Sequence, residues 1–163
     1  MEKFAEHKQR AVQNVKVADH MLTMTYPLVK DPKLLIAVLE NLFMACTNAM
    51  ASVLHYERSF KRIPPFHDTF ESKYTLFKQK IVPHYQVDLK WVRFIAELKE
   101  LVQDHKESTT EFPRKGKFVM ADKDYRIKTI SEEDLKYYLR LTKDFVSYAL
   151  QLVSKNDAKF GRR

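Results

Sequence analysis

Ionisable residues are concentrated in one stretch, ERSFKRIPPFHDTFE, which runs from Glu57 to Glu71. Within it, four residues separate Arg62 from His67. A histidine that titrates near neutral pH can take a proton from a ribose 2′-hydroxyl or give one to a leaving oxygen. An arginine can hold the phosphate and stabilise the charge that develops on it. Arg62 and His67 are therefore the candidate catalytic residues of a metal-independent ribonuclease.

Both residues also have a structural interpretation. His67 would cap or pack against the first turn of the helix that follows, and Arg62 would form a surface ion pair with Asp68 or Glu71. The double proline before the histidine makes the turn rigid in either case. The two interpretations differ in whether Arg62 and His67 converge in one cleft.

The spacing of Arg62 and His67 in a small helical protein resembles the HEPN family of helical ribonucleases and nucleotide-binding proteins, whose common motif is arginine, four to six residues, and histidine. The resemblance implies a helical bundle, RNA as the substrate, and a homodimer in which two motifs share one cleft. Ile63 follows the arginine, where family catalysts usually carry a polar residue, and Pro64 and Pro65 are a second departure. The resemblance therefore supports the fold more than it supports catalysis.

Polar side chains also form a stripe within an otherwise apolar segment. Asn41, Asn48, Ser52 and His55 follow one another at steps of seven, four and three residues. On a helix these positions fall within roughly 60° of one another. Buried polar groups must be hydrogen-bonded. The stripe predicts either a structural network that sets the register of two helices or the wall of a polar cleft near Arg62.

The net charge of +8 favours a polyanionic partner, and we expect RNA in preference to DNA. The stretch FPRKGKFV carries three cations and no acid, which is typical of a phosphate-contacting loop or of a solvated one. The candidate nucleic-acid-binding residues are Arg58, Lys61, Arg114, Lys115, Lys117, Arg126 and Lys128. The same charges would also suit a non-catalytic basic helical module that binds structured nucleic acid, a ribonucleoprotein or a protein partner.

Several classes of site find no support in the sequence. The two glycines form neither GxGxxG nor GxxxxGK[ST], and the chain contains no CxxC, HExxH or Glu-x-x-His pattern. We therefore expect no cofactor and no metal.

Cys46 stands in an apolar run, which is typical of a buried free thiol in a reducing compartment. The N-terminal residues have no apolar signal region, so we expect a cytoplasmic protein.

Segments of helical periodicity between the prolines predict about five helices. Their expected ranges are 3–25, 31–60, a third that follows His67 or Asp68, 88–106, and a last that begins after an N-cap at Ser131. The second is apolar nearly all round and is interrupted by polar residues. This pattern predicts the central helix of a bundle or an oligomer contact. Because of the polar interruptions, we expect no membrane span.

The predicted fold class is all-α, an up-and-down bundle of about five helices in a single domain, 1–163. Residues 117–130 are β-prone around a polar turn and predict a small β-hairpin inserted before the last helix. Residues 155–163 read as a basic tail. The apolar second helix also predicts a homodimer, because five helices need not cover it completely.

Overall fold

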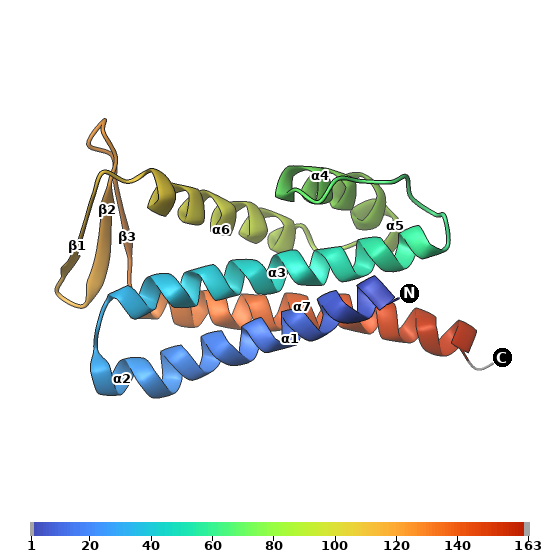
Figure 1. Ribbon diagram of the computed structural model, residues 1–163, viewed down its shortest axis with the longest axis horizontal. Coiled ribbons are helices and arrows are strands. Elements are labelled where there is room, and N and C mark those ends of the chain that lie inside the picture. Colours follow the sequence, from blue (N-terminus) through green and yellow to red (C-terminus); the bar gives the residue numbers. More distant parts are fainter. Residues whose placement is uncertain (1, 162–163) are drawn as a thin grey trace.

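The computed structural model describes the backbone of residues 2–161 and the side chains of residues 3–154. Its long helices run in alternating directions, as in an up-and-down bundle, and a small sheet lies at one end (Figure 1). The elements are α1 (Glu2–His20), the π-helical turn η1 (Met21–Thr25), α2 (Tyr26–Val29), α3 (Lys33–Ser59), α4 (Phe70–Leu76), the π-helical turn η2 (Phe77–Ile81), α5 (Val82–Tyr85), α6 (Leu89–Glu107), β1 (Thr110–Arg114), β2 (Lys117–Ala121), β3 (Ile127–Ile130) and α7 (Glu132–Gly161). Of the predicted basic tail, the backbone as far as Gly161 belongs to α7, and the rest lies outside the described residues.

Helix α3 is the central helix, as its apolar composition predicted. Sixteen of its residues are buried, and α1, α6 and α7 contact it along its length. By length and composition α3 could also cross a membrane, alone among the described helices. Burial inside the bundle accounts for the same apolar composition. The homodimer stays a prediction.

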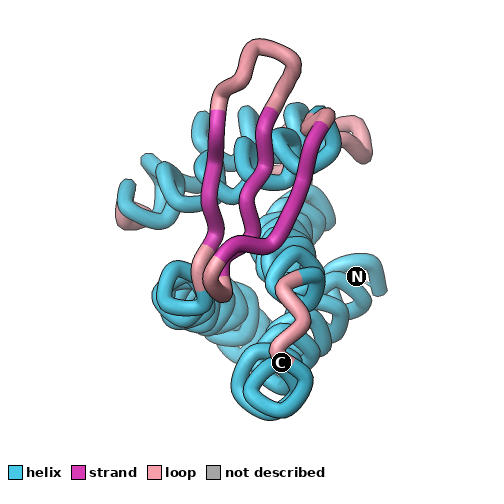
Figure 2. The backbone as a smooth tube through the Cα atoms, turned by 90° about the vertical axis from the view of Figure 1, so that its left-hand side faces the viewer, coloured by secondary structure: helices cyan, strands magenta, loops and turns pink. Residues whose placement is uncertain are grey.

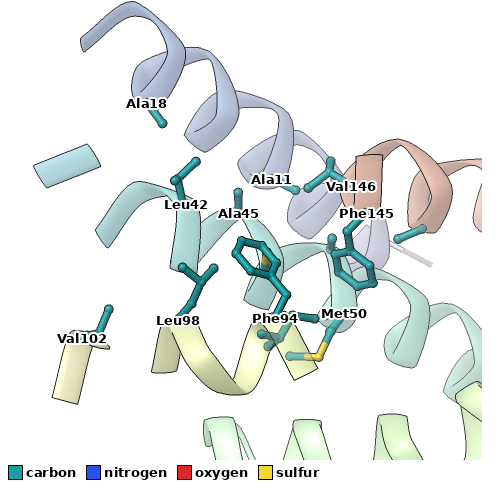
Figure 3. Close-up of a cluster of buried hydrophobic side chains, with 14 of the residues drawn as sticks. Ala11, Ala18, Leu42, Ala45, Met50, Phe94, Leu98, Val102, Phe145 and Val146 are labelled. Carbon is teal, nitrogen blue, oxygen red and sulfur yellow. The ribbon is translucent and has the colours of Figure 1, made fainter. Parts of the chain in front are cut away.

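The core lies between α3 and the three helices that contact it. Figure 3 shows Met50 of α3 near Phe94 of α6 and Phe145 of α7, and Leu42 of α3 directed toward Ala18 of α1. Fully buried alanines on the facing sides of α1 and α3, such as Ala11 and Ala45, keep the side chains between these two helices short (Figure 3). Small residues at a helix contact allow the backbones to approach closely, and that approach brings the polar groups of α1 within reach of α3.

Cys46 is a buried free thiol, as predicted. Its Sγ contacts Thr142 Oγ1 at 3.8 Å in the contact between α3 and α7. Burial raises the pKa of the Cys46 thiol to about 12. Since the thiolate is the nucleophile, this cysteine is inert at neutral pH.

Local hydrogen bonds explain where three of the helices begin. Asp88 accepts from the Lys90 N–H at the start of α6, at 2.9 Å. Ser131 and Asp134 bond reciprocally at the start of α7, each at 3.1 Å, which is the arrangement of a capping box. Thr69 accepts from Ser72 N–H, so α4 begins one or two residues later than expected.

Two helical segments continue past a proline by means of a π-helical turn. η1 precedes Pro27 and η2 precedes Pro83, and each short helix that follows ends at a residue with φ of 54°, Lys30 or Gln86. Proline has no N–H to donate and its ring crowds the carbonyl one turn earlier, which a wider turn accommodates. The first helical segment therefore reaches Val29, beyond the end that periodicity predicted at residue 25.

The predicted hairpin is instead part of a three-stranded antiparallel sheet of order β1-β2-β3, so the all-α prediction was wrong in this detail. Strands β2 and β3 match the predicted residues, and β1 was missed. Pro113 of β1 pairs with Phe118 without donating a backbone hydrogen bond. An edge strand tolerates such a residue because only one of its sides is paired. The protein is mostly helical with a small sheet.

Lys115 and Gly116 form the two-residue turn between β1 and β2, with φ of 52° and 74°. Positive φ at both positions belongs to the type I′ turn, whose twist matches that of a hairpin. The turn is attached to the bundle by Tyr26, whose hydroxyl donates to the Gly116 carbonyl at 3.4 Å. The three cations of this region therefore lie on a hairpin formed by β1 and β2, whereas a loop was predicted.

Candidate functional site

The C-terminus of α3 brings Arg62 back toward Glu57. Lys61 has φ of 58°, and its N–H donates to the Arg58 carbonyl at 2.9 Å, while the Arg62 N–H donates to the Glu57 carbonyl at 3.1 Å. These two bonds are those of a Schellman motif, in which a left-handed residue ends the helix. The motif usually joins two apolar side chains. Here Arg62 Nη1 donates to Glu57 Oε2 at 3.1 Å.

Glu57 is a buried carboxylate with two side-chain donors. Its residue is 3% exposed, and Oε1 accepts a hydrogen bond from the Tyr85 hydroxyl. The carboxylate raises the pKa of Arg62, first through the hydrogen bond and then through charge. The guanidinium also lies over the Phe60 ring, 4.8 Å from its centroid. A charge buried in this way is stable only when it is paired, and Arg62 supplies the pairing.

A pocket of about 390 Å³ opens beside Arg62. It is lined by Glu57, Arg62, Ile63, Lys80, Ile81 and His84. Lys80 belongs to η2 and His84 to α5, which pack beside the end of α3 (Figure 1). About twenty residues separate these two side chains from Arg62, so no local motif indicated them.

His67 does not line this pocket. Its side chain is exposed, and its backbone N–H donates to Ser72 Oγ at 3.0 Å in the first turn of α4. Arg62 pairs with Glu57 in place of the predicted partners. Asp68 contacts Lys73 Nζ at 2.5 Å, and Glu71 lies 3.9 Å from Lys99 Nζ. The joint catalytic role of Arg62 and His67 stays a prediction.

The predicted polar stripe forms a hydrogen-bond network between α1 and α3. Asn48 Nδ2 donates to Asn14 Oδ1 at 3.0 Å, and Asn14 Nδ2 donates to Asn41 Oδ1 at 3.4 Å. Ser52 Oγ donates to the Phe4 carbonyl at 2.9 Å. These bonds satisfy polar groups inside the helix contact and set the register of the two helices.

His55 is the last member of the stripe and stacks on His7 of α1, with ring centroids 5.0 Å apart and an interplanar angle of 7°. His7 Nδ1 lies 2.9 Å from Asn48 Oδ1. Because an amide oxygen only accepts, His7 donates in this bond. Phe66 covers the His55 ring from the turn after α3, at 5.0 Å. The stacked histidines thus join α1, α3 and that turn.

Burial lowers the pKa of His55 to about 4, and neighbouring positive charges add to the effect. Those charges come from His7, Lys3 and Lys73, and Asp68 opposes them. Lys73 is itself buried, at 7% exposed. A second cation is therefore unfavourable here, and His55 is neutral at physiological pH.

The seven candidate nucleic-acid-binding residues do not form one surface. Arg58 and Lys61 lie at the C-terminal end of α3, and the other five lie on the sheet beyond its N-terminal end (Figure 1). A helix of 27 residues is about 40 Å long. The predicted residues therefore belong to two separate basic regions, one at each end of the bundle.

Two of the five sheet cations lie near acidic side chains. Lys128 Nζ lies 3.5 Å from Glu100 and 4.0 Å from Asp104, both on α6. Arg126 shares a depression with these acids and Asp122. Among the described side chains, the salt bridges include none to Arg114, Lys115 or Lys117. The charges of these three side chains are therefore not balanced by a salt bridge within the described part of the chain.

The outer face of the sheet, defined by Phe112, Arg114, Lys115, Lys117, Val119, Ile127 and Thr129, carries these three cations beside apolar side chains. These residues line a groove of about 350 Å³. Phe112 and Ile127 are 40% and 66% exposed. The inner face packs Phe118, Met120 and Ile130 against the bundle. Figure 2 shows the three strands in front of the helices, with no helix across their outer side.

Among the side chains of residues 3–154, no three histidine, cysteine, aspartate or glutamate residues are grouped so as to hold a metal ion. Comparison with known proteins adds no further constraint. No family model, no curated protein and no solved structure matches the chain.

Proposed function

We propose that the protein binds single-stranded RNA through the outer face of its sheet, as a basic module that needs no catalysis for this role. The observation that carries the proposal is the combination on one open face of three cations and an exposed aromatic ring. Proteins that bind single strands combine cations that follow the backbone with aromatic rings on which bases stack. Phe112 would supply the stacking surface, and Arg114, Lys115 and Lys117 would contact phosphates.

The register of the sheet supports this assignment. Arg114 of β1 pairs with Lys117 of β2. Two residues further from the turn on each strand, Phe112 pairs with Val119. Side chains two residues apart lie on the same face of a strand. The cations therefore stand at one end of an apolar strip, so a strand of RNA along the strip would meet the base-stacking ring and the phosphate contacts together.

The test is the affinity for a fluorescent single-stranded RNA at several salt concentrations. The variant Arg114→Ala/Lys115→Ala/Lys117→Ala should lose at least about 10-fold in affinity near 0.1 M salt, because each phosphate contact contributes a slope of about 0.7 in log affinity against log salt. The slope itself should decrease by about 2. Phe112→Ala should weaken binding with the salt slope unchanged, since stacking releases no counterions.

The matched control removes three charges elsewhere. Lys90, Lys136 and Lys143 are each within 3.7 Å of a carboxylate, and the corresponding triple alanine variant also lowers the net charge from +8 to +5. It should keep most of the affinity. Equal losses in both triple variants would mean that net charge alone draws RNA to the protein, and the sheet would not be the binding surface.

A second candidate function is metal-independent RNA cleavage at the turn after α3, as in the HEPN-like interpretation. One observation favours chemistry around Arg62: it lines a pocket that also contains Lys80 and His84, although His67 lies outside this pocket. Incubation with mixed RNA in the presence of EDTA should then yield fragments, and His67→Ala should abolish them while RNA affinity is retained, because proton transfer acts in the transition state. Intact RNA with the wild-type protein would eliminate this function and leave the sheet proposal unaffected.

A further inference from the structure

The pocket at the end of α3 contains basic side chains from two distant parts of the chain. Arg62 comes from the turn after α3, and Lys80 and His84 come from η2 and α5. We propose that this pocket is a binding site for a phosphate monoester, in which Arg62, Lys80 and His84 contact the phosphate oxygens. The proposal does not depend on RNA binding by the sheet, which lies at the other end of the bundle (Figure 1).

The electrostatic balance of the pocket favours an anion. Glu57 is its one acidic lining residue, and its two oxygens accept from Arg62 and Tyr85. Among the described side chains, no salt bridge joins Lys80 or His84 to an acid. Since Glu57 balances the charge of Arg62, the positive charge of Lys80 is not compensated within the pocket. A phosphate monoester, which carries between one and two negative charges at neutral pH, would be attracted by this surplus.

The walls of the pocket strengthen that attraction. Ile63 and Ile81 line it and are 6% and 1% exposed. Apolar walls lower the local dielectric constant, so a charge contact here is stronger than on an open surface. The volume of about 390 Å³ exceeds that of a phosphate group and leaves room for part of an organic substituent. The pocket therefore suits a monoester as well as free phosphate.

Arg62 and His84 are also held in place before a ligand arrives. The Schellman motif and Glu57 orient Arg62. Tyr85 bonds Glu57 from α5, and the His84 ring packs edge-on against Tyr85 with centroids 4.6 Å apart. The Tyr148 hydroxyl of α7 donates to the Tyr85 carbonyl at 3.4 Å. Because both walls are joined through Glu57 and Tyr85, less ordering entropy is lost on binding.

A ligand of this chemistry has several sources, and the experiment separates them. Titration calorimetry or NMR would use inorganic phosphate, adenosine 5′-monophosphate, and one RNA oligonucleotide with either a 5′-phosphate or a 5′-hydroxyl. We expect saturable binding of the nucleotide. Tighter binding of the 5′-phosphorylated oligonucleotide would identify an RNA end as the ligand, and equal binding of phosphate and nucleotide would identify the free anion.

Lys80→Ala and His84→Ala should each lower the affinity for adenosine 5′-monophosphate at least about 5-fold, since each removes one contact to the phosphate. Lys78→Ala is the matched control, because Lys78 lies in the same π-helical turn but over the Tyr74 ring, 4.9 Å from its centroid. The Arg114→Ala/Lys115→Ala/Lys117→Ala variant should bind the nucleotide as the wild type does. No saturation by 10 mM of any probe, or equal losses in Lys78→Ala and Lys80→Ala, would overturn the proposal.

Discussion

Glu57→Ala is expected to lower the free energy of unfolding by about 2–3 kcal/mol, because it removes a buried acceptor that two side chains share. Arg62 would lose the carboxylate that pairs with it at the end of α3, and the Tyr85 hydroxyl would lose its bond to that carboxylate. The loss is below the full cost of breaking a buried ion pair, since the Arg62 side chain is 37% exposed. Urea denaturation of both proteins measures the difference.

Two further variants identify the cause. Glu57→Gln keeps an oxygen that can accept from Tyr85 but loses the charge attraction to Arg62, and should cost about 1 kcal/mol. Glu40→Ala removes the same side chain from an exposed position of α3 and should change stability by less than about 0.5 kcal/mol. A Glu57→Ala protein as stable as Glu40→Ala would show that the shared carboxylate contributes nothing.

Acidification is expected to destabilise the protein through His55. The unfolded chain binds a proton at this residue below pH 6.5, whereas burial beside His7 keeps the pKa of folded His55 near 4. The stability that depends on a neutral His55 is complete above pH 6.5 and is lost as the pH falls toward 4. The shift corresponds to about 3 kcal/mol at most, and solvent screening of this half-buried ring reduces it to about 1–2 kcal/mol.

Replacement of the ring tests this assignment. His55→Phe retains an aromatic side chain between His7 and Phe66 but does not titrate. The loss of stability between pH 6.5 and 4 should therefore be smaller in this variant by about 1–2 kcal/mol. His20→Gln changes an exposed histidine of α1 and should leave the wild-type pH dependence intact. Parallel stability curves for wild type and His55→Phe would assign the acid sensitivity to other groups.

Features that depend on residues close in sequence were predictable from the sequence. The N-caps at Asp88 and Ser131 bond to backbone groups two and three residues away. The apolar periodicity of residues 31–60 indicated a central helix, and burial of the lone thiol followed from its apolar neighbours. These features depend only on residues that are close in sequence, namely on hydrogen bonds over two to four residues and on the side-chain period of a helix. The sequence alone therefore determines them.

The sheet shows where local reasoning was insufficient. β1 contains a proline and ionic residues, and its own sequence resembles a loop. It becomes a strand because β2 supplies its hydrogen-bond partners, and β2 in turn packs on the bundle through Phe118 and Met120. Strand pairing depends on the partner and on burial more than on intrinsic preference.

The candidate sites depend on tertiary structure to a greater degree. The sequence put Arg62 and His67 together by spacing, but packing of η2 and α5 against the end of α3 brings Lys80 and His84 to the pocket beside Arg62. The seven predicted basic residues divide between two ends of a bundle because α3 is about 40 Å long. Charge and residue type follow from the sequence by itself. Which charges meet is decided by the packing of helices around α3, because contacts between distant segments exist only once the apolar faces have been buried together.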